Sequence, residues 1–159
     1  MPTPTYTPLA NVTLGSSTSA VTFSSISQSY RDLRLVITGT SSTFVGVFWI
    51  INSDATSTNY YNVYMLGDGG GTGSGSANSN SWSSFRSSNL TQYVADVFDY
   101  SATNKHKTVL LRQNAASESG TLAIAGRWAN TTAITSIQIS LGVATFSTGT
   151  TFALYGIAS

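Results

Sequence analysis

The sequence contains no cysteine, a single histidine and very few charged residues. Without cysteine there are no disulfides, and with His106 as the one histidine a Cys/His metal site cannot form. Charged residues make up 8% of the chain, compared with about 25% in an average soluble domain. The net charge of +1 provides no large field for attracting nucleic acid or an anionic membrane. We therefore expect no metal, no cofactor, and neither nucleic acid nor a membrane as a partner.

Residues that favour helices are also scarce, since Glu118 is the only glutamate. No apolar run reaches the roughly 18 residues of a membrane-spanning helix. The opening Met1-Pro2-Thr3-Pro4 lacks the basic start and apolar segment of a signal peptide. Serine and threonine are abundant instead, and threonine favours strands while serine favours turns. The composition therefore predicts an all-β protein with long polar loops.

Hydrophobic and polar residues alternate near both ends of the chain, with the two-residue period of a strand that has one buried face. Residues 137–141 and 152–155 alternate in this way on either side of a Ser/Thr/Gly-rich turn at residues 146–150. This pattern predicts a β-hairpin. Residues 12–14 and 21–23 flank a similar polar segment and predict a second hairpin.

Further strand candidates occupy the middle of the chain. They comprise residues 33–38, 44–51, 60–66, 93–100, 105–112 and 121–128. With the two hairpins they make about nine or ten short strands and leave no segment with a helical period. The pattern therefore predicts an antiparallel β-sandwich of the jelly-roll type, formed as one domain by residues 9–159.

Two segments are expected to differ from regular strands. All three prolines lie within residues 1–8, which predicts an extended N-terminal arm, since proline fixes φ and donates no hydrogen bond. Residues 67–81 are dominated by Gly, Ser and Asn and predict a flexible surface loop. The nearly continuous apolar run at residues 44–51 fits a strand buried on both faces or an interface strand, and so favours self-association.

The titratable residues provide no catalytic constellation. His106 lies between Lys105 and Lys107, which predicts a solvated position at an exposed strand edge and not a catalytic relay. Asp96 and Asp99 are an odd number of residues apart, so a regular strand points them to opposite faces. Either acid could pair with a distant one, but we expect strand-end acids or ion-pair partners of nearby basic residues. The sequence therefore predicts no catalytic residue and no enzyme.

A glycine-rich segment and several aromatic residues are the remaining features that could form a binding site. Residues 67–75 have neither the spacing of a dinucleotide-binding loop nor the lysine of a phosphate-binding loop. Aromatic side chains can stack on sugar rings or anchor an interface. Our candidates for protein or glycan contact are Trp82, Phe85 and Arg86, beside the glycine-rich segment, and Tyr6 in the arm.

Several short segments resemble small structural proteins of tailed bacteriophages, cyanophages among them. The segments are Tyr6-Thr7-Pro8-Leu9-Ala10, Thr13-Leu14-Gly15-Ser16, Val21-Thr22-Phe23-Ser24-Ser25-Ile26, Tyr30-Arg31-Asp32-Leu33, Lys107-Thr108-Val109-Leu110-Leu111-Arg112, Ala133-Ile134-Thr135-Ser136-Ile137 and Phe146-Ser147-Thr148-Gly149-Thr150-Thr151-Phe152-Ala153-Leu154-Tyr155-Gly156-Ile157. The likeness extends over most of the chain and is weakest at residues 52–89, where partner or receptor specificity is expected. No functional residue comes with it.

The resemblance implies that the protein is part of a virion, which is assembled in the host cytoplasm. It implies a capsid decoration or cement protein that binds the outside of the head, with the major capsid protein or other virion proteins as partners. It also implies self-association as a homotrimer. The alternative is a tail-fibre or adhesion module that binds host-surface glycans.

Overall fold

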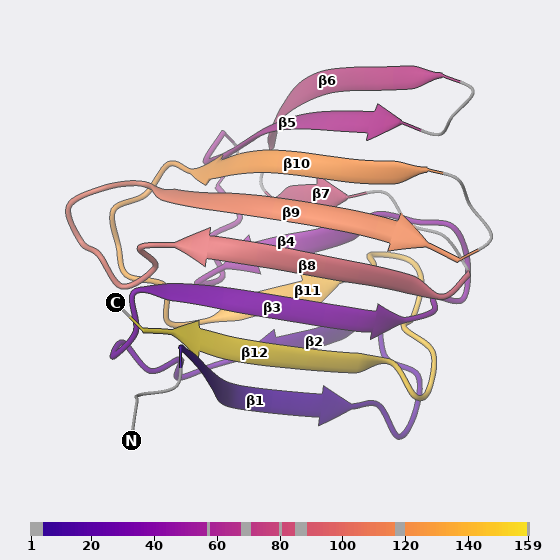
Figure 1. Ribbon diagram of the computed structural model, residues 1–159, viewed down its shortest axis with the longest axis horizontal. Helices are drawn as coiled ribbons and strands as arrows, with labels where there is room; N and C mark the ends of the chain where they lie inside the picture. Colours follow the sequence, from indigo (N-terminus) through magenta and orange to yellow (C-terminus); the bar gives the residue numbers. More distant parts are fainter. Residues whose placement is uncertain are drawn as a thin grey trace.

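The chain folds into two antiparallel β-sheets that lie face to face (Figure 1). This computed structural model describes residues 5–56, 58–67, 71–79, 81–84, 89–116 and 120–158. The larger sheet comprises, in spatial order, β1 (Tyr6–Thr13), β12 (Thr151–Ile157), β3 (Asp32–Gly39), β8 (Thr91–Phe98), β9 (Lys107–Ala115), β10 (Thr121–Trp128), β5 (Tyr60–Gly67) and β6 (Thr72–Ser79). The smaller sheet comprises β2 (Ala20–Phe23), β11 (Ile137–Ser140), β4 (Val47–Ile51) and β7 (Trp82–Ser84). The predicted all-β antiparallel sandwich of the jelly-roll type is confirmed.

The core lies between the two sheets and follows the alternation of the sequence. On β3, Leu33, Leu35 and Ile37 are fully buried, so the one-sided pattern of residues 33–38 is confirmed. On the smaller sheet, Val47, Trp49 and Ile51 of β4 are fully buried from the other side. Removing these apolar surfaces from water is the main force that holds the sheets together. Over the described residues, no helix is long and apolar enough to cross a membrane.

Both predicted hairpins are wrong, because the strands on either side of each turn belong to different sheets. β11 pairs with β2 and β4, whereas β12 pairs with β1 and β3. The connection after β11 does not turn back on itself, because Phe146 is buried at the sandwich edge. There it forms bridges to Thr18 and Ser41 and packs edge-on against Phe152, with ring centroids 5.0 Å apart. Burial of this side chain directs the chain across from one sheet to the other.

Part of the predicted flexible loop is a strand. Residues Thr72–Ser79 form β6, which pairs with the whole of β5 from Thr72 opposite Gly67 to Ser79 opposite Tyr60. A strand ladder is made by backbone groups, so glycine and serine can form it where a neighbouring strand offers an unpaired edge. The prediction of a loop is therefore wrong for residues 72–79, while residues 68–70 and 80 lie outside the described residues.

The predicted N-terminal arm is wrong for residues 6–8, which belong to a strand. β1 begins at Tyr6, and Tyr6 to Pro8 pair with β12 before the register shifts between Pro8 and Ala10. Because β1 is at the edge of the sheet, a proline can be placed there without interrupting a ladder on both sides. Tyr6 to Pro8 are thus sheet and not arm, and residues 1–4 lie outside the described residues.

Candidate functional site

The outer face of the larger sheet carries a groove with a volume of about 850 Å³ that crosses β8, β9, β10, β5 and β6. Two adjacent rows of residues on the outward positions of these strands line it. In spatial order, one row consists of Gln92, Asn114, Thr121, Gly67 and Thr72. The adjacent row consists of Val94, Arg112, Ala123, Met65 and Ser74. The groove is therefore built by strand register, with no loop required.

Alternation along each strand explains why these side chains point outward. On β9, Leu111 is buried in the core and Arg112 is exposed. On β10, Leu122 and Ile124 are buried while Ala123 between them is exposed. The buried residues hold the strands in the sandwich, and the residues between them are free to line the groove.

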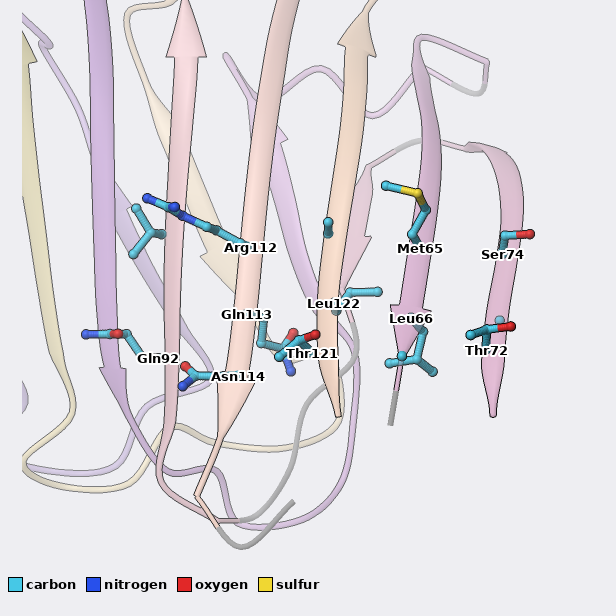
Figure 2. Close-up of a pocket in the computed structure, with 14 residues that line it drawn as sticks. Met65, Leu66, Thr72, Ser74, Gln92, Arg112, Gln113, Asn114, Thr121 and Leu122 are labelled. Carbon is cyan, nitrogen blue, oxygen red and sulfur yellow. The ribbon is translucent and has the colours of Figure 1, made fainter. Parts of the chain in front are cut away.

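Figure 2 shows how the groove side chains are placed. Arg112 extends from β9 across β8, beside the amide side chains of Gln92 and Asn114 at the same end of the groove. Met65 on β5 and Ser74 on β6 lie on the opposite side. Groups that donate and accept hydrogen bonds thus stand next to aliphatic surface over five neighbouring strands.

Among the described residues that line the groove, Arg112 is the only charged one. It forms no ion pair with a described residue. On the same face, the carboxylate of Asp96 is already paired, because it accepts bonds of 2.6 and 2.8 Å from Nε and Nη2 of Arg34. The hydrogen bond to Asp96 raises the pKa of Arg34 above its usual value. The groove therefore has positive character without a compensating carboxylate among its lining residues.

A second groove, with a volume of about 430 Å³, lies farther along β10, β5 and β6. Its lining includes Tyr61, Val63, Ser76, Ala125 and Arg127 on the outer face. The guanidinium carbon of Arg127 lies 4.4 Å from the centroid of the Tyr61 ring. Tyr61 is 37% exposed and Val63 is 56% exposed, so this groove offers an aromatic ring and aliphatic surface to a ligand.

The contact residues that the sequence suggested do not share one surface in the structure. Trp82 is 3% exposed, so its predicted place at the surface is wrong. It packs edge-on against Tyr60 with ring centroids 5.4 Å apart, and its indole nitrogen lies against the face of Gly126, where a side chain would collide with it. Tyr6 is exposed and lies beside Arg34. Phe85 and Arg86 lie outside the described residues.

The titratable residues near the other end of β9 differ in part from expectation. His106 is exposed, as predicted, but Lys107 is fully buried. The ammonium of Lys107 donates to the carbonyls of Lys105 and Thr131, at 2.9 and 3.1 Å, and burial lowers its pKa. On β9, Lys107 shares the buried face with Val109 and Leu111. The predicted exposed strand edge is therefore wrong for Lys107. Asp99 pairs with Lys105 at 3.1 Å, in agreement with the expectation of an ion pair with a nearby basic residue.

Sequence reasoning missed the groove. Alternation along β8, β9 and β10 identifies the outward positions, including Arg112 and Asn114, but gives no order for the strands. Residues 72–79 were interpreted as a loop, so the wall formed by β6 was not expected. No group of three or more His, Cys, Asp or Glu side chains among the described residues is placed to hold a metal ion.

Fold and site together define an antiparallel β-sandwich with a groove across the outer face of its larger sheet. No family model matches the chain, and no curated protein matches it. Among solved structures, the chain is similar to the galectin LEC-6 of Caenorhabditis elegans, with a TM-score of 0.42 and 9% sequence identity over 94% of this chain and 96% of the galectin chain. A likeness at this level says nothing about what this chain binds.

Proposed function

We propose that this protein is a non-enzymatic glycan-binding module that holds its ligand in the groove on the outer face of the larger sheet. The observation that carries this proposal is the groove itself, with hydrogen-bonding and aliphatic side chains interleaved over five strands. Its volume of about 850 Å³ falls within the roughly 300–1,000 Å³ of typical small-ligand sites.

The lining suits the chemistry of a sugar. A sugar ring has hydroxyl groups at its edge, which both donate and accept hydrogen bonds, and apolar C–H groups on its faces. Gln92 and Asn114 carry amides that donate and accept, and Thr121 adds a hydroxyl. Val94 and Met65 provide aliphatic surface beside them. The open shape, which runs across several strands, favours a chain of sugars over a small enclosed ligand.

The positions of the acidic residues argue against glycoside hydrolysis in this groove. Glycoside hydrolysis ordinarily needs two carboxyl groups on either side of the scissile bond. Of the described residues that line the groove, none is an aspartate or a glutamate. Asp96, on the same face, is occupied by Arg34. The groove is equipped to bind a sugar chain and to release it unchanged.

The setting of this binding activity is a further part of the proposal. The resemblance to phage structural proteins offers a tail-fibre or adhesion module as its alternative reading, and the groove favours that alternative, which would bring the groove to glycans of the host surface. The contact is expected at the groove and not at Trp82, which is buried. The decoration function and the homotrimer stay predictions, which locating the protein on intact particles and measuring its mass in solution would test.

A glycan array tests the proposed function. We expect the purified protein to bind a subset of microbial surface glycans. Asn114→Ala should lower the affinity about threefold to tenfold, the effect of losing one or two hydrogen bonds. Asn104→Ala, the same change at an exposed position before β9, is the matched control and should leave binding unchanged. Absence of binding to every glycan, or equal losses in both variants, would contradict the proposal.

A further inference from the structure

The cations of the described chain are partnered, with one exception. Arg31, Arg34 and Lys105 form ion pairs with Asp32, Asp96 and Asp99. Lys107 donates to two backbone carbonyls, and Arg127 stacks on Tyr61. Arg112 alone has neither a carboxylate nor an aromatic ring within contact among the described residues, and it lines the groove.

We propose that the groove is specific for acidic glycans, with Arg112 pairing with a carboxylate or sulfate group of the sugar chain. This inference rests on the proposed function and names its ligand class. The planar guanidinium offers paired N–H donors that match the geometry of such an anion. A neutral sugar would leave this charge without a counter-ion in the bound state, whereas an acidic sugar supplies one.

The neighbours of Arg112 are suited to the rest of an acidic sugar. Gln92 and Asn114 lie in the adjacent row, within reach of the ring hydroxyls that flank an acidic group (Figure 2). Val94 is directly opposite Arg112 on β8 and also lines the groove, so aliphatic surface adjoins the strand position that carries the arginine. Among the described residues that line the groove there is no acid.

A second cation continues the same track. Ala123 is opposite Arg112, and Arg127 follows on the same face of β10. Arg127 is four positions beyond Ala123, a distance of about 13 Å at the usual rise of a strand. A glycan that runs along β10 from the first groove to the second would present one acidic group to Arg112. It would then place a later acidic group or a ring face at Arg127 and Tyr61.

Matched pairs of glycans test this inference. The probes are uronic-acid oligosaccharides with their carboxyl-reduced forms, and sulfated oligosaccharides with their desulfated forms. We expect the acidic member of a bound pair to bind at least tenfold more tightly, with the advantage declining at high salt because exposed charges are screened. Which pair shows the larger ratio distinguishes a carboxylate from a sulfate ligand.

Two variants of Arg112 locate the effect. Arg112→Gln should lower the affinity for the acidic member far more than the affinity for the neutral member, and so abolish the preference. Arg112→Lys keeps the charge but not the paired donors, and should retain part of the preference. Arg112 is exposed, and an unchanged melting temperature for both variants would show that the fold is intact.

The outcomes separate the inference from the proposed function. If glycans bind but the two members of each pair bind equally, or if Arg112→Gln weakens both members alike, the acidic specificity is wrong and the glycan-binding function stands. If an oligoglutamate peptide binds as tightly as the best acidic glycan, the groove recognises charge and not sugar, and the inference is overturned. If no glycan binds, the proposed function fails and the inference fails with it.

Discussion

The two faces of the larger sheet are made by the same strands and are chemically opposite. Most inward positions are apolar and buried, as at Leu33, Leu35 and Trp128. The outward positions mix polar groups with exposed apolar ones, and Met65 and Leu110 remain 65% and 49% exposed. An outward face needed only for solubility would carry charged side chains at such positions. Exposed apolar residues gathered on one face instead indicate a surface that contacts something else.

The charged residues can be compared in the same way. Lys107, on the inner face of β9, and Asp54, in the loop after β4, are satisfied by neighbouring groups of their own chain. On the outer face, Arg34 is paired with Asp96, whereas Arg112 has no such partner among the described residues. The difference indicates that Lys107 and Asp54 serve stability and that Arg112 is available for a ligand. The following predictions test this comparison, beginning with the largest expected effect.

Two adjacent leucines on β9 compare the faces directly. Leu111 is 6% exposed and Leu110 is 49% exposed. Leu111→Ala should lower the free energy of unfolding by about 2–5 kcal/mol, because it leaves a cavity between the sheets. Leu110→Ala, the identical change one residue away, should cost less than about 1 kcal/mol. Urea unfolding of the two variants measures the difference, and equal losses would show that the outer face is covered by part of the same chain.

Asp54 provides the corresponding test for charge. Its carboxylate accepts hydrogen bonds from Trp128 Nε1 at 2.7 Å and from Asn59 at 2.8 Å. Burial opposes its ionisation, but the hydrogen bonds from Thr56, Asn59 and Trp128 outweigh that effect and lower the pKa of Asp54 to about 2 from its usual 3.8. The folded state therefore binds this proton more weakly than the unfolded state. The resulting stability is complete above about pH 4 and is lost as the pH falls through about 2.

Asp54→Asn should accordingly destabilise the protein by roughly 2 kcal/mol at pH 7. The gap between this variant and the natural protein should narrow as the pH approaches 2. Arg112→Gln, on the outer face, should be close to neutral in stability at both pH values and serves as the control. Unfolding free energies at pH 7 and near pH 2 measure both variants. A gap for Asp54→Asn that does not change with pH would show that the carboxylate charge is not what stabilises the fold.

The edge strand β1 should show the smallest effect. The Tyr6 hydroxyl accepts a hydrogen bond of 2.9 Å from Arg34 Nη1, in an exposed position, and the Arg34 guanidinium lies 5.2 Å from the Tyr6 ring centroid. Tyr6→Phe removes the hydroxyl and keeps the ring, so the cost should be about 0.5 kcal/mol or less. A melting curve measures it. A much larger loss would mean that β1 contributes more to the sandwich than its edge position implies.

Much of the fold was predictable because alternation is a local property. The inward residues of β3 and β10 are apolar at every second position, so their strands and buried faces follow from the sequence directly. The pairing of those strands was not predictable. Residues 137–141 and 152–155 have the pattern of a hairpin, and what separates them is burial of Phe146 against Phe152, a contact between residues whose positions only the completed sandwich defines.

The candidate site depends on strand pairing, which is non-local, and not on alternation alone. Composition and period determined that this is an all-β sandwich with alternating faces, because burying one side of each strand is the only way this chain can form a core. The tertiary structure decided that Arg112, Asn114, Thr121 and Met65 share one groove, because strand order depends on backbone pairing between segments distant in sequence. It also decided that Trp82 belongs to the core. The indole nitrogen of Trp82 lies against Gly126, where any side chain would collide with it, and no sequence pattern reveals this contact.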